Sequence, residues 1–262
     1  MNLSVSNIAW DERDDEIILA RMQELGYRGL EIAPTRIIRD APYDHTDEAA
    51  EWKRKMKEKY GFEISSMQSI WFGRTERLFG SQTERSALLH YTKKAVDFAA
   101  AVGCGNLVFG CPKNRSLPKG ADPGAAEEFF RAVGEYAKKH GTVISMEANP
   151  AIYNTNYIND TLSAIELVEK VNCEGFRLNL DIGTMICNDE DPEDIVPYVK
   201  LINHVHISEP HLRPIEHREI HKRLFSILKS SGYERFISVE MGRQPDNDRL
   251  MDAMIYLKEI VN

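Results

Sequence analysis

Four short hydrophobic runs in the sequence each end on a side chain that can bind a metal. These runs are VISME at Glu147, FRLNLD at Asp181, INHVH at His206 and FISVE at Glu240. A single acid at such a place is commonly a surface residue or a helix cap, but parallel strands would bring four strand ends together. Three carboxylates and one imidazole, without a thiolate, suit Mn²⁺ or Mg²⁺, and also accept Zn²⁺, Co²⁺ or Fe²⁺. The pattern therefore predicts a divalent metal site in an enzyme.

The elements that must position these residues recur along the whole chain. Eight short apolar runs, often β-branched, alternate with segments of helical periodicity. The strand-like runs are LSVSNIA, RGLEIA, FEISSMQ, NLVFG, TVISME, FRLNLD, INHVHIS and FISVEM. The segment Asp14 to Leu25 is typical of the helices, with Ile17, Ile18, Met22 and Leu25 expected on one face and Gly26 as the stop signal.

Strand followed by helix, repeated eight times, predicts the α/β class and a (β/α)₈ TIM barrel. The competing fold is a doubly wound open sheet, but no G-x-G-x-x-G turn follows the first run. Long irregular stretches follow several of the predicted strands, where a barrel builds its active site. Among them are residues 111–123, 148–159 and 209–214. We expect one domain, residues 1–262, because no linker or change in composition divides the chain.

Composition limits the partners that we expect. The net charge of -8 disfavours nucleic acid, since proteins bind it largely through lysine and arginine. No run approaches the length of a membrane span, and no signal peptide is evident, so we expect a cytoplasmic protein that does not bind membranes. The four cysteines, Cys104, Cys111, Cys173 and Cys187, form no C-x-x-C pair and are expected to be reduced.

The ordered motifs MEANP, LDIGTM, HVHISEP and SVEM resemble the xylose isomerase-like TIM barrel superfamily, in particular its sugar phosphate isomerase and epimerase branch, which includes ketose 3-epimerases. The resemblance spans nearly the whole chain. It implies one divalent cation, Mn²⁺ first, held by Glu147, Asp181, His206 and Glu240. It also implies that Glu147 and Glu240 act as acid and base, moving a proton through an enediolate of a sugar or polyol ketone. Paired barrels occur in this family, which leaves a homo-oligomer open.

The same superfamily includes endonuclease IV, which has three zinc ions, and the sequence departs from that pattern. Thr184 stands where the endonuclease has a histidine after the strand 6 aspartate, and Gln68 stands at its strand 3 histidine position. IEHRE around His217 is similar to its DRHE segment, but Ile215 replaces the aspartate ligand. We therefore do not expect a three-metal nuclease. Many ketose epimerases also have a histidine at the position of Thr184, so the substrate stays open.

Six further side chains are candidates for contact with substrate. They are Glu31 in RGLEI, Gln68, Asn149 in EANP, Thr184, Arg213 and His217. Each also has an ordinary structural explanation, as a loop residue, a cap or part of a turn. We expect His204 to point to the opposite side of the strand from His206 and to be a packed or hydrogen-bonded structural histidine.

Three alternatives to a sugar isomerase or epimerase remain. A dehydratase that acts on a keto-inositol would begin with the same deprotonation and then expel a hydroxyl group. A barrel without catalysis could bind a carbohydrate as a sensor, because fold alone does not establish function. An endonuclease would need further metal ligands. Nucleophilic acyl transfer and nucleotide hydrolysis are disfavoured, since neither G-x-S-x-G nor a Walker loop is present.

Overall fold

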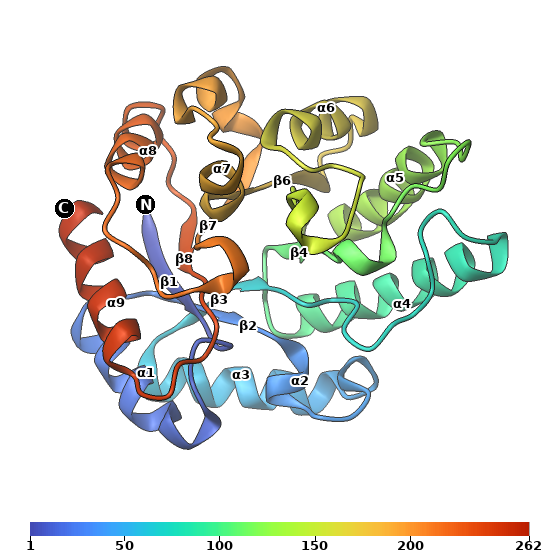
Figure 1. Ribbon diagram of the computed structural model, residues 1–262. Coiled ribbons are helices and arrows are strands. Elements are labelled where there is room, and N and C mark those ends of the chain that lie inside the picture. Colours follow the sequence, from blue (N-terminus) through green and yellow to red (C-terminus); the bar gives the residue numbers. More distant parts are fainter. Residues whose placement is uncertain (262) are drawn as a thin grey trace.

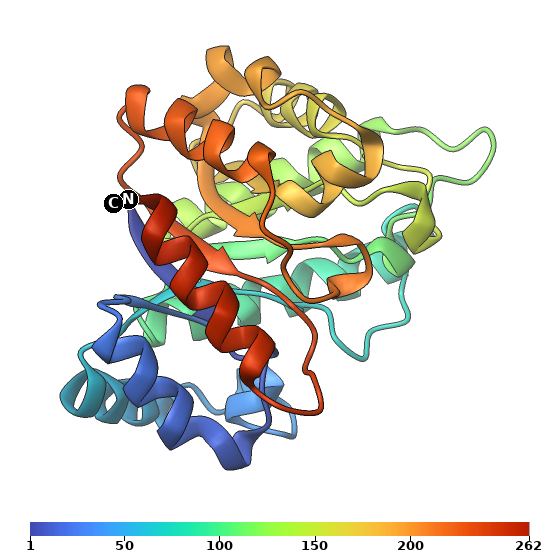
Figure 2. The same cartoon turned by 60° about the vertical axis from the view of Figure 1, so that its left-hand side comes forward.

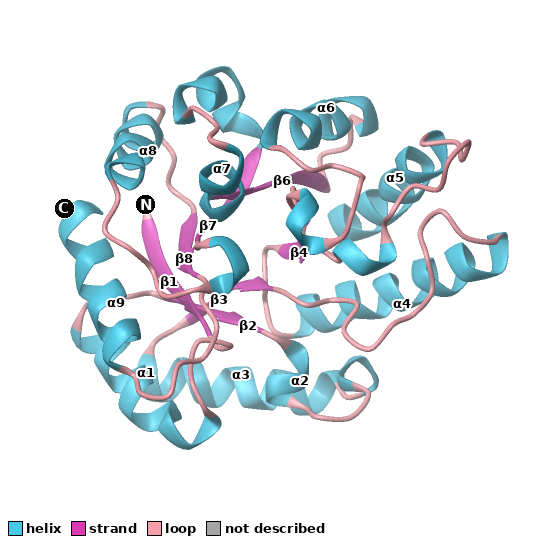
Figure 3. Ribbon diagram, in the orientation of Figure 1, coloured by secondary structure: helices cyan, strands magenta, loops and turns pink. Residues whose placement is uncertain are grey.

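The computed structural model describes residues 1–261, and its centre is a closed barrel of eight parallel strands (Figure 1, Figure 3). The strands follow one another around the barrel in sequence order, and β1 closes it by pairing with β8. Their bounds are β1 Asn2–Ser6, β2 Gly29–Ile32, β3 Glu63–Met67, β4 Leu107–Phe109, β5 Ile144–Glu147, β6 Phe176–Asp181, β7 Ile202–Ile207 and β8 Phe236–Val239. The predicted (β/α)₈ barrel is confirmed, and each strand lies within a run that the sequence indicated, except that β1 begins one residue earlier, at Asn2.

Helices surround the strands, and a view turned by 60° shows α9 in front of β1 (Figure 2). The helices are α1 Asp15–Glu24, α2 Pro34–Ile37, α3 Thr46–Tyr60, α4 Gln82–Ala101, α5 Gly124–Lys139, α6 Thr161–Val171, α7 Ile182–Asn188, α8 Glu219–Ser230 and α9 Asp248–Val261. The 3₁₀ helices are η1 Glu12–Asp14, η2 Pro42–Asp44, η3 Pro112–Asn114, η4 Ala151–Tyr153, the longer η5 Pro192–Leu201 and η6 Pro210–Leu212. Within residues 1–261, no helix combines the length and the apolar composition that crossing a bilayer requires.

Helix α1 shows how the sequence pattern maps onto packing. It ends close to the predicted place, and Gly26 follows with a φ of +77°, which glycine adopts without steric cost. Ile18 and Met22 are fully buried against the barrel, but Ile17 is 63% exposed. The expectation that Ile17 shares the buried face is therefore wrong. Ile18, Leu19 and Met22 define the buried face, and Ile17, which lies about 100° away from Ile18 on the side opposite Leu19, turns out of it.

The strand register brings the predicted site residues side by side. Asp181 on β6 pairs with His206 on β7, and Glu147 on β5 pairs with Asn179 on β6. Glu240 directly follows β8, and its amide donates to the carbonyl of Ile207 at 2.9 Å. The β6–β7 register shifts once, between Leu178 and Asn179, and the pairing that follows sets Asp181 beside His206.

The lower part of the barrel interior is polar. The Ser4 and Ser65 hydroxyls lie 2.5 Å apart, and Asn203 donates to Asn106 at 2.7 Å. Asn106 in turn accepts from Ser145. These buried groups satisfy one another, as buried polar groups must. A layer of hydrogen bonds therefore supports the carboxyl ends of the strands.

Close packing at the start of β6 gives a stability prediction. A Cβ atom on Gly175 would overlap the backbone carbonyl of Gly134 in α5, and neither backbone can move away easily. We expect Gly175→Ala to lower the free energy of unfolding by about 2 kcal/mol, as overpacking does. The control is Gly105→Ala, because nothing lies within 4 Å of a Cβ there. Equal urea-unfolding midpoints for the two variants would contradict the prediction.

Candidate functional site

The structure brings the four predicted metal ligands together at the carboxyl ends of the strands. Glu147, Asp181, His206 and Glu240 each offer one ligand atom, and these atoms all lie within 4.8 Å of one another. His206 Nδ1 lies 2.9 Å from Glu147 Oε1 and 3.2 Å from Glu240 Oε2. Both glutamates are 9% exposed, while His206 is fully buried. The two glutamates can therefore be reached from solvent, and the histidine lies beneath them.

Asp181 is held in place by the beginning of helix α7. Thr184 donates to Asp181 Oδ2 through both its amide and its hydroxyl, each at 2.9 Å. Ser208 donates its hydroxyl to the other oxygen, Oδ1. Donors at a helix N-terminus stabilise a carboxylate, and they fix the orientation of this one.

Charge is crowded in this cluster. Burial raises the pKa of Asp181 to about 6, and the carboxylate of Glu147 adds to the effect. Burial also raises the pKa of Glu240 to about 7. Burial opposes the charged form of His206, but the carboxylates of Glu240 and Glu31 raise its pKa well above the ordinary value. For Asp181 and Glu240, acidic neighbours disfavour the ionised form and the positive charge of His206 favours it.

The donor set fits a divalent cation. Three carboxylates and one imidazole carry more negative than positive charge in a buried place, and a bound cation would balance that excess. Oxygen donors with one nitrogen suit Mn²⁺ and Mg²⁺ and also accept Zn²⁺, Co²⁺ or Fe²⁺. The cluster of Glu147, Asp181, His206 and Glu240 can therefore hold a metal ion.

Glu31 orients His206 from below. It is fully buried, and its Oε2 accepts from His206 Nε2 at 2.8 Å and lies 3.2 Å from His204 Nε2. Burial would raise the pKa of Glu31, but the neighbouring His206 and His204 hold it below its ordinary value. A carboxylate on one imidazole nitrogen leaves the other free for a metal. Glu31 is not among the residues that line the cavity, so the structure places it behind His206 and not at the cavity surface.

His204 corrects a second expectation. It points to the same side of β7 as His206, because both rings contact Glu31. Side chains on a strand alternate with a period of two, so residues two apart must share a face. The expected structural role holds, since His204 Nε2 also lies 2.9 Å from the Ser238 hydroxyl. Glu31, His204 and His206 form a second group of closely spaced side chains that could bind a metal. Both histidines contact Glu31 directly, and His206 also belongs to the group of Glu147, Asp181 and Glu240.

A cavity of about 190 Å³ opens above the four clustered side chains. Its lining combines three of the predicted ligands with loop residues: Gln68, Ser69, Val108, Gly110, Cys111, Pro112, Glu147, Asn149, Tyr153, Asp181, Ser208, Leu212 and Glu240. Cys111, Tyr153 and Leu212 come from long loops that the sequence assigned to this face. The cavity is therefore shaped by loops and chemically defined by strand ends.

The other predicted substrate contacts divide into two groups. Gln68 and Asn149 line the cavity. Thr184 is buried, and its hydroxyl oxygen lies 2.9 Å from the carbonyl oxygen of Ala148 as well as from Asp181 Oδ2, so its one proton serves either acceptor. Arg213 is exposed and donates to the carbonyl of Pro210, and His217 stacks on Tyr256 and pairs with Asp252. The structure does not bring Thr184, Arg213 or His217 to the cavity surface.

Two residues that the sequence analysis missed hold Glu147. Asn179 donates to Glu147 Oε1 at 2.8 Å, and the buried Arg115 donates to the Glu147 carbonyl at 2.8 Å and to Asn149 Oδ1 at 3.0 Å. Asn179 was detectable, because it lies two residues before Asp181 and therefore shares its face of the strand. Arg115 gave no such signal, since it comes from an irregular loop.

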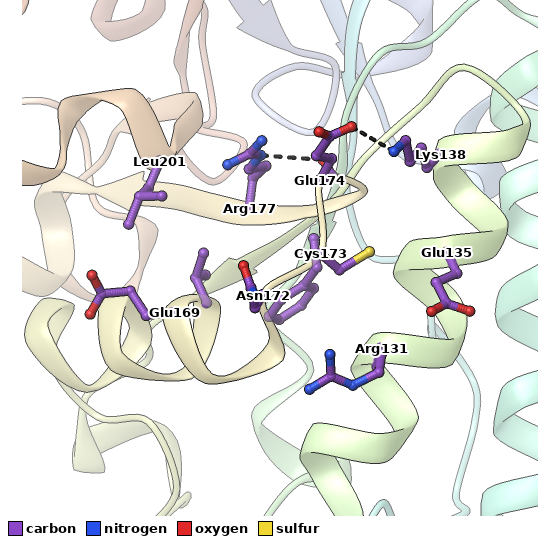
Figure 4. Close-up of a pocket in the computed structure, with 11 residues that line it drawn as sticks. Arg131, Glu135, Lys138, Glu169, Asn172, Cys173, Glu174, Arg177 and Leu201 are labelled. Atoms are coloured by element: carbon purple, nitrogen blue, oxygen red, sulfur yellow. Dashed lines mark hydrogen bonds and ion pairs between the residues drawn. The ribbon is translucent and has the colours of Figure 1, made fainter.

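A larger hollow, of about 810 Å³, lies between α5 and α6 at the start of β6 (Figure 4). One ion pair lies along it, between Lys138 and Glu174 at 2.6 Å, and the Glu174 carbonyl accepts from Arg177. Neither of the metal-capable groups found within residues 1–261 lies in it. The smaller cavity at the carboxyl ends of the strands is therefore the candidate active site.

The role of Glu31 can be tested through metal affinity. Glu31→Gln keeps the shape of the side chain but weakens the acceptor of the two imidazole protons. We expect the Mn²⁺ dissociation constant to rise at least tenfold, the usual effect of losing such a partner. Titration followed by the EPR signal of free Mn²⁺ measures it. Glu63→Gln, at an exposed position on β3, is the control and should bind as wild type does. Unchanged affinity in Glu31→Gln would contradict this role.

The pKa shifts predict how metal affinity depends on pH. Glu240 and Asp181, with pKa values of about 7 and about 6, must lose protons to bind a cation, and so must His206 Nδ1. Affinity for Mn²⁺ should therefore fall as the pH drops through 7 and then 6, by at least tenfold per pH unit at the lower end. Calorimetric titration across this range measures it. In Glu240→Gln, Mn²⁺ affinity should depend less on pH near pH 7. An affinity that is independent of pH in the wild-type protein would refute the prediction.

Comparisons with known proteins agree with this architecture. The chain is similar in structure to a D-psicose 3-epimerase crystallised in the presence of D-fructose (TM-score 0.80, 15% identity, covering 100% of this chain and 99% of that one). It is also similar to an E. coli 3-keto-D-glucoside 4-epimerase (TM-score 0.75, 19% identity, covering 99% of this chain and 98% of that one). A third similar structure is a family 2 AP endonuclease from Brucella melitensis (TM-score 0.72, 20% identity, covering 94% of this chain and 95% of that one). At these identities the likeness shows the fold alone. No curated protein sequence matches significantly.

The family is shown by a sequence model that covers nearly the whole chain. The model described as "Xylose isomerase-like TIM barrel" matches residues 19–260. The resemblance that the strand-end motifs indicated is thereby confirmed, and the chain belongs to the xylose isomerase-like TIM barrel family.

Proposed function

We propose that this protein is a divalent-metal-dependent sugar isomerase or epimerase that works by proton transfer through an enediolate. One observation carries the proposal: Glu147 and Glu240 line the same cavity, and His206 Nδ1 contacts both of them from below. They come from β5 and from the end of β8, so they approach the cavity from different parts of the barrel wall. Two carboxylates placed in this way can serve two faces of one small substrate.

Each group has a distinct task in the proposed reaction. A divalent cation held by Glu147, Asp181, His206 and Glu240, Mn²⁺ by preference, would supply a Lewis acid that stabilises negative charge on the substrate carbonyl oxygen. One of the glutamates removes the proton from the neighbouring carbon, and the other returns a proton. The buried Asp181 and His206 keep their positions through Thr184, Ser208 and Glu31, so the geometry does not relax between the two transfers.

The cavity favours a small, uncharged sugar or polyol ketone. No lysine or arginine is among the residues of the described chain that line it, while three carboxylates are, so a phosphate would meet no positively charged side chain there. Gln68 and Asn149 offer amides for hydroxyl groups. Two of the similar structures are of enzymes whose names specify a ketose and a keto-glucoside as substrate, which supports this class. The net charge of -8 and the single cluster at the cavity argue against nuclease activity.

Solvent-hydrogen exchange tests the proposal directly. Purified protein would be analysed for bound metal and then incubated in D₂O with Mn²⁺ and a panel of ketoses. We expect one metal ion per chain and deuterium incorporation into at least one ketose. Glu147→Gln and Glu240→Gln should each reduce incorporation at least a hundredfold, because each removes a proton-transfer group. Glu63→Gln is the control and should keep wild-type activity.

The product distinguishes the reaction classes that share this site. An isomer of unchanged mass indicates isomerisation or epimerisation, and loss of water indicates a dehydratase acting on the same metal site. Binding of a sugar without any incorporation of deuterium, with Mn²⁺ present, would overturn the proposal in favour of a carbohydrate-binding barrel.

A further inference from the structure

The two glutamates of the site differ in how firmly the protein holds them. Glu147 Oε1 accepts from Asn179 at 2.8 Å and lies 2.9 Å from His206 Nδ1, and Oε2 accepts from Asn149 at 3.2 Å. For Glu240, the one side-chain hydrogen-bonding contact within residues 1–261 is His206 Nδ1. Glu147 is therefore held at both oxygens, and Glu240 at one.

Asn179 has a particular place among these contacts. It is 1% exposed and lies on β6, next to Glu147 on β5. Its Nδ2 faces both Glu147 Oε1 and, at 3.3 Å, His206 Nδ1. Of the two groups on Oε1, His206 is a predicted metal ligand, so Asn179 is the one that can keep Oε1 in place when a cation is bound. Oε2 is left on the side of Gly110 and Asn149, both of which line the cavity.

The other end of the same amide is unsatisfied. Asn179 Oδ1 is buried and has no hydrogen-bond partner among the described residues. Rotating the amide would not solve this, because it would set Oδ1 against the Glu147 carboxylate. A buried carbonyl without a partner costs stability, so an apolar side chain would suit the folding of this position better. What the asparagine offers here is the hydrogen bond from Nδ2 to Glu147.

We infer that Asn179 is a positioning residue for the metal site: it holds Glu147 Oε1 and thereby presents the carboxylate to the cation in one orientation. This inference rests on the metal site of the proposed function. It predicts different effects on metal affinity and on the stability of the fold. Removing the amide should weaken metal binding and should not weaken the fold.

The test is Asn179→Leu, which keeps a branched side chain of similar shape and removes both polar atoms. Three quantities are measured: the melting temperature of the metal-free protein, the Mn²⁺ dissociation constant from EPR titration, and the EPR spectrum of bound Mn²⁺. We expect a melting temperature equal to or above that of wild type, a dissociation constant at least about tenfold higher, and an altered spectrum of the bound ion.

The matched control is Asn203→Leu. Asn203 is another buried asparagine in the barrel, but it donates to Asn106 and to the carbonyl of Gly105 at the opposite end of the strands. Its replacement should lower the melting temperature, because it leaves partners unsatisfied, and should leave the Mn²⁺ affinity of the folded protein within about twofold of wild type.

Each outcome decides between the possible roles of Asn179. Wild-type Mn²⁺ affinity in Asn179→Leu would overturn the inference, and so would a melting temperature well below that of wild type, since either would make the residue an ordinary packing position. Failure of wild-type protein to bind Mn²⁺ would overturn the proposed metal site together with this inference. Normal binding by wild type and unchanged affinity in the variant would overturn the inference alone.

Discussion

Three carboxylates and one imidazole share a buried volume in which their ligand atoms all lie within 4.8 Å of one another, and the surrounding structure is arranged to keep them there. Like charges repel strongly in a place of low dielectric constant, so side chains on a flexible surface would move apart. Here the ladder of the closed barrel fixes the backbone positions, and neighbouring donors fix the side chains. Asp181 is held by Thr184 and Ser208, Glu147 by Asn149 and Asn179, and His206 by Glu31.

The fixed strand ends and the loops contribute different properties to the site. The strands supply the candidate ligands, whereas Cys111, Tyr153 and Leu212 reach the cavity from long loops after β4, β5 and β7. This division fits the range of names among the similar structures, which include epimerases of different sugars and an AP endonuclease at 15–20% identity. The fold brings the four candidate ligands together and the loops shape the cavity above them, so the substrate must be inferred from the cavity and not from the fold.

The sequence predicted what depends on short periodic patterns. The strands appeared as short apolar runs, and the four candidate ligands appeared because each run ends on one. The role of Glu31 was not predictable in this way, because its partner His206 lies 175 residues further along the chain. Arg213 and His217 lie in the loop that follows His206 and β7, but closeness in sequence does not give the direction of a side chain. His217, for example, stacks on Tyr256 of α9. The position of His204 was misjudged although the period of a strand determines it.

The polar side chains inside the barrel orient the candidate ligands at a cost in stability. A barrel interior is ordinarily filled by layers of branched apolar side chains, whereas this one places Glu31, His204 and Asn179 beneath the site. Six buried side-chain atoms in the described chain have no hydrogen-bond partner, and three of them belong to Glu31, Arg115 and Asn179, which contact Glu147 or His206. In each of these three side chains, one polar atom contacts the site and another is left without a partner, whereas the remaining three unsatisfied atoms belong to Thr142, Thr155 and His221. Unmatched atoms beside the candidate ligands are expected of a functional site, where local stability is given up for position.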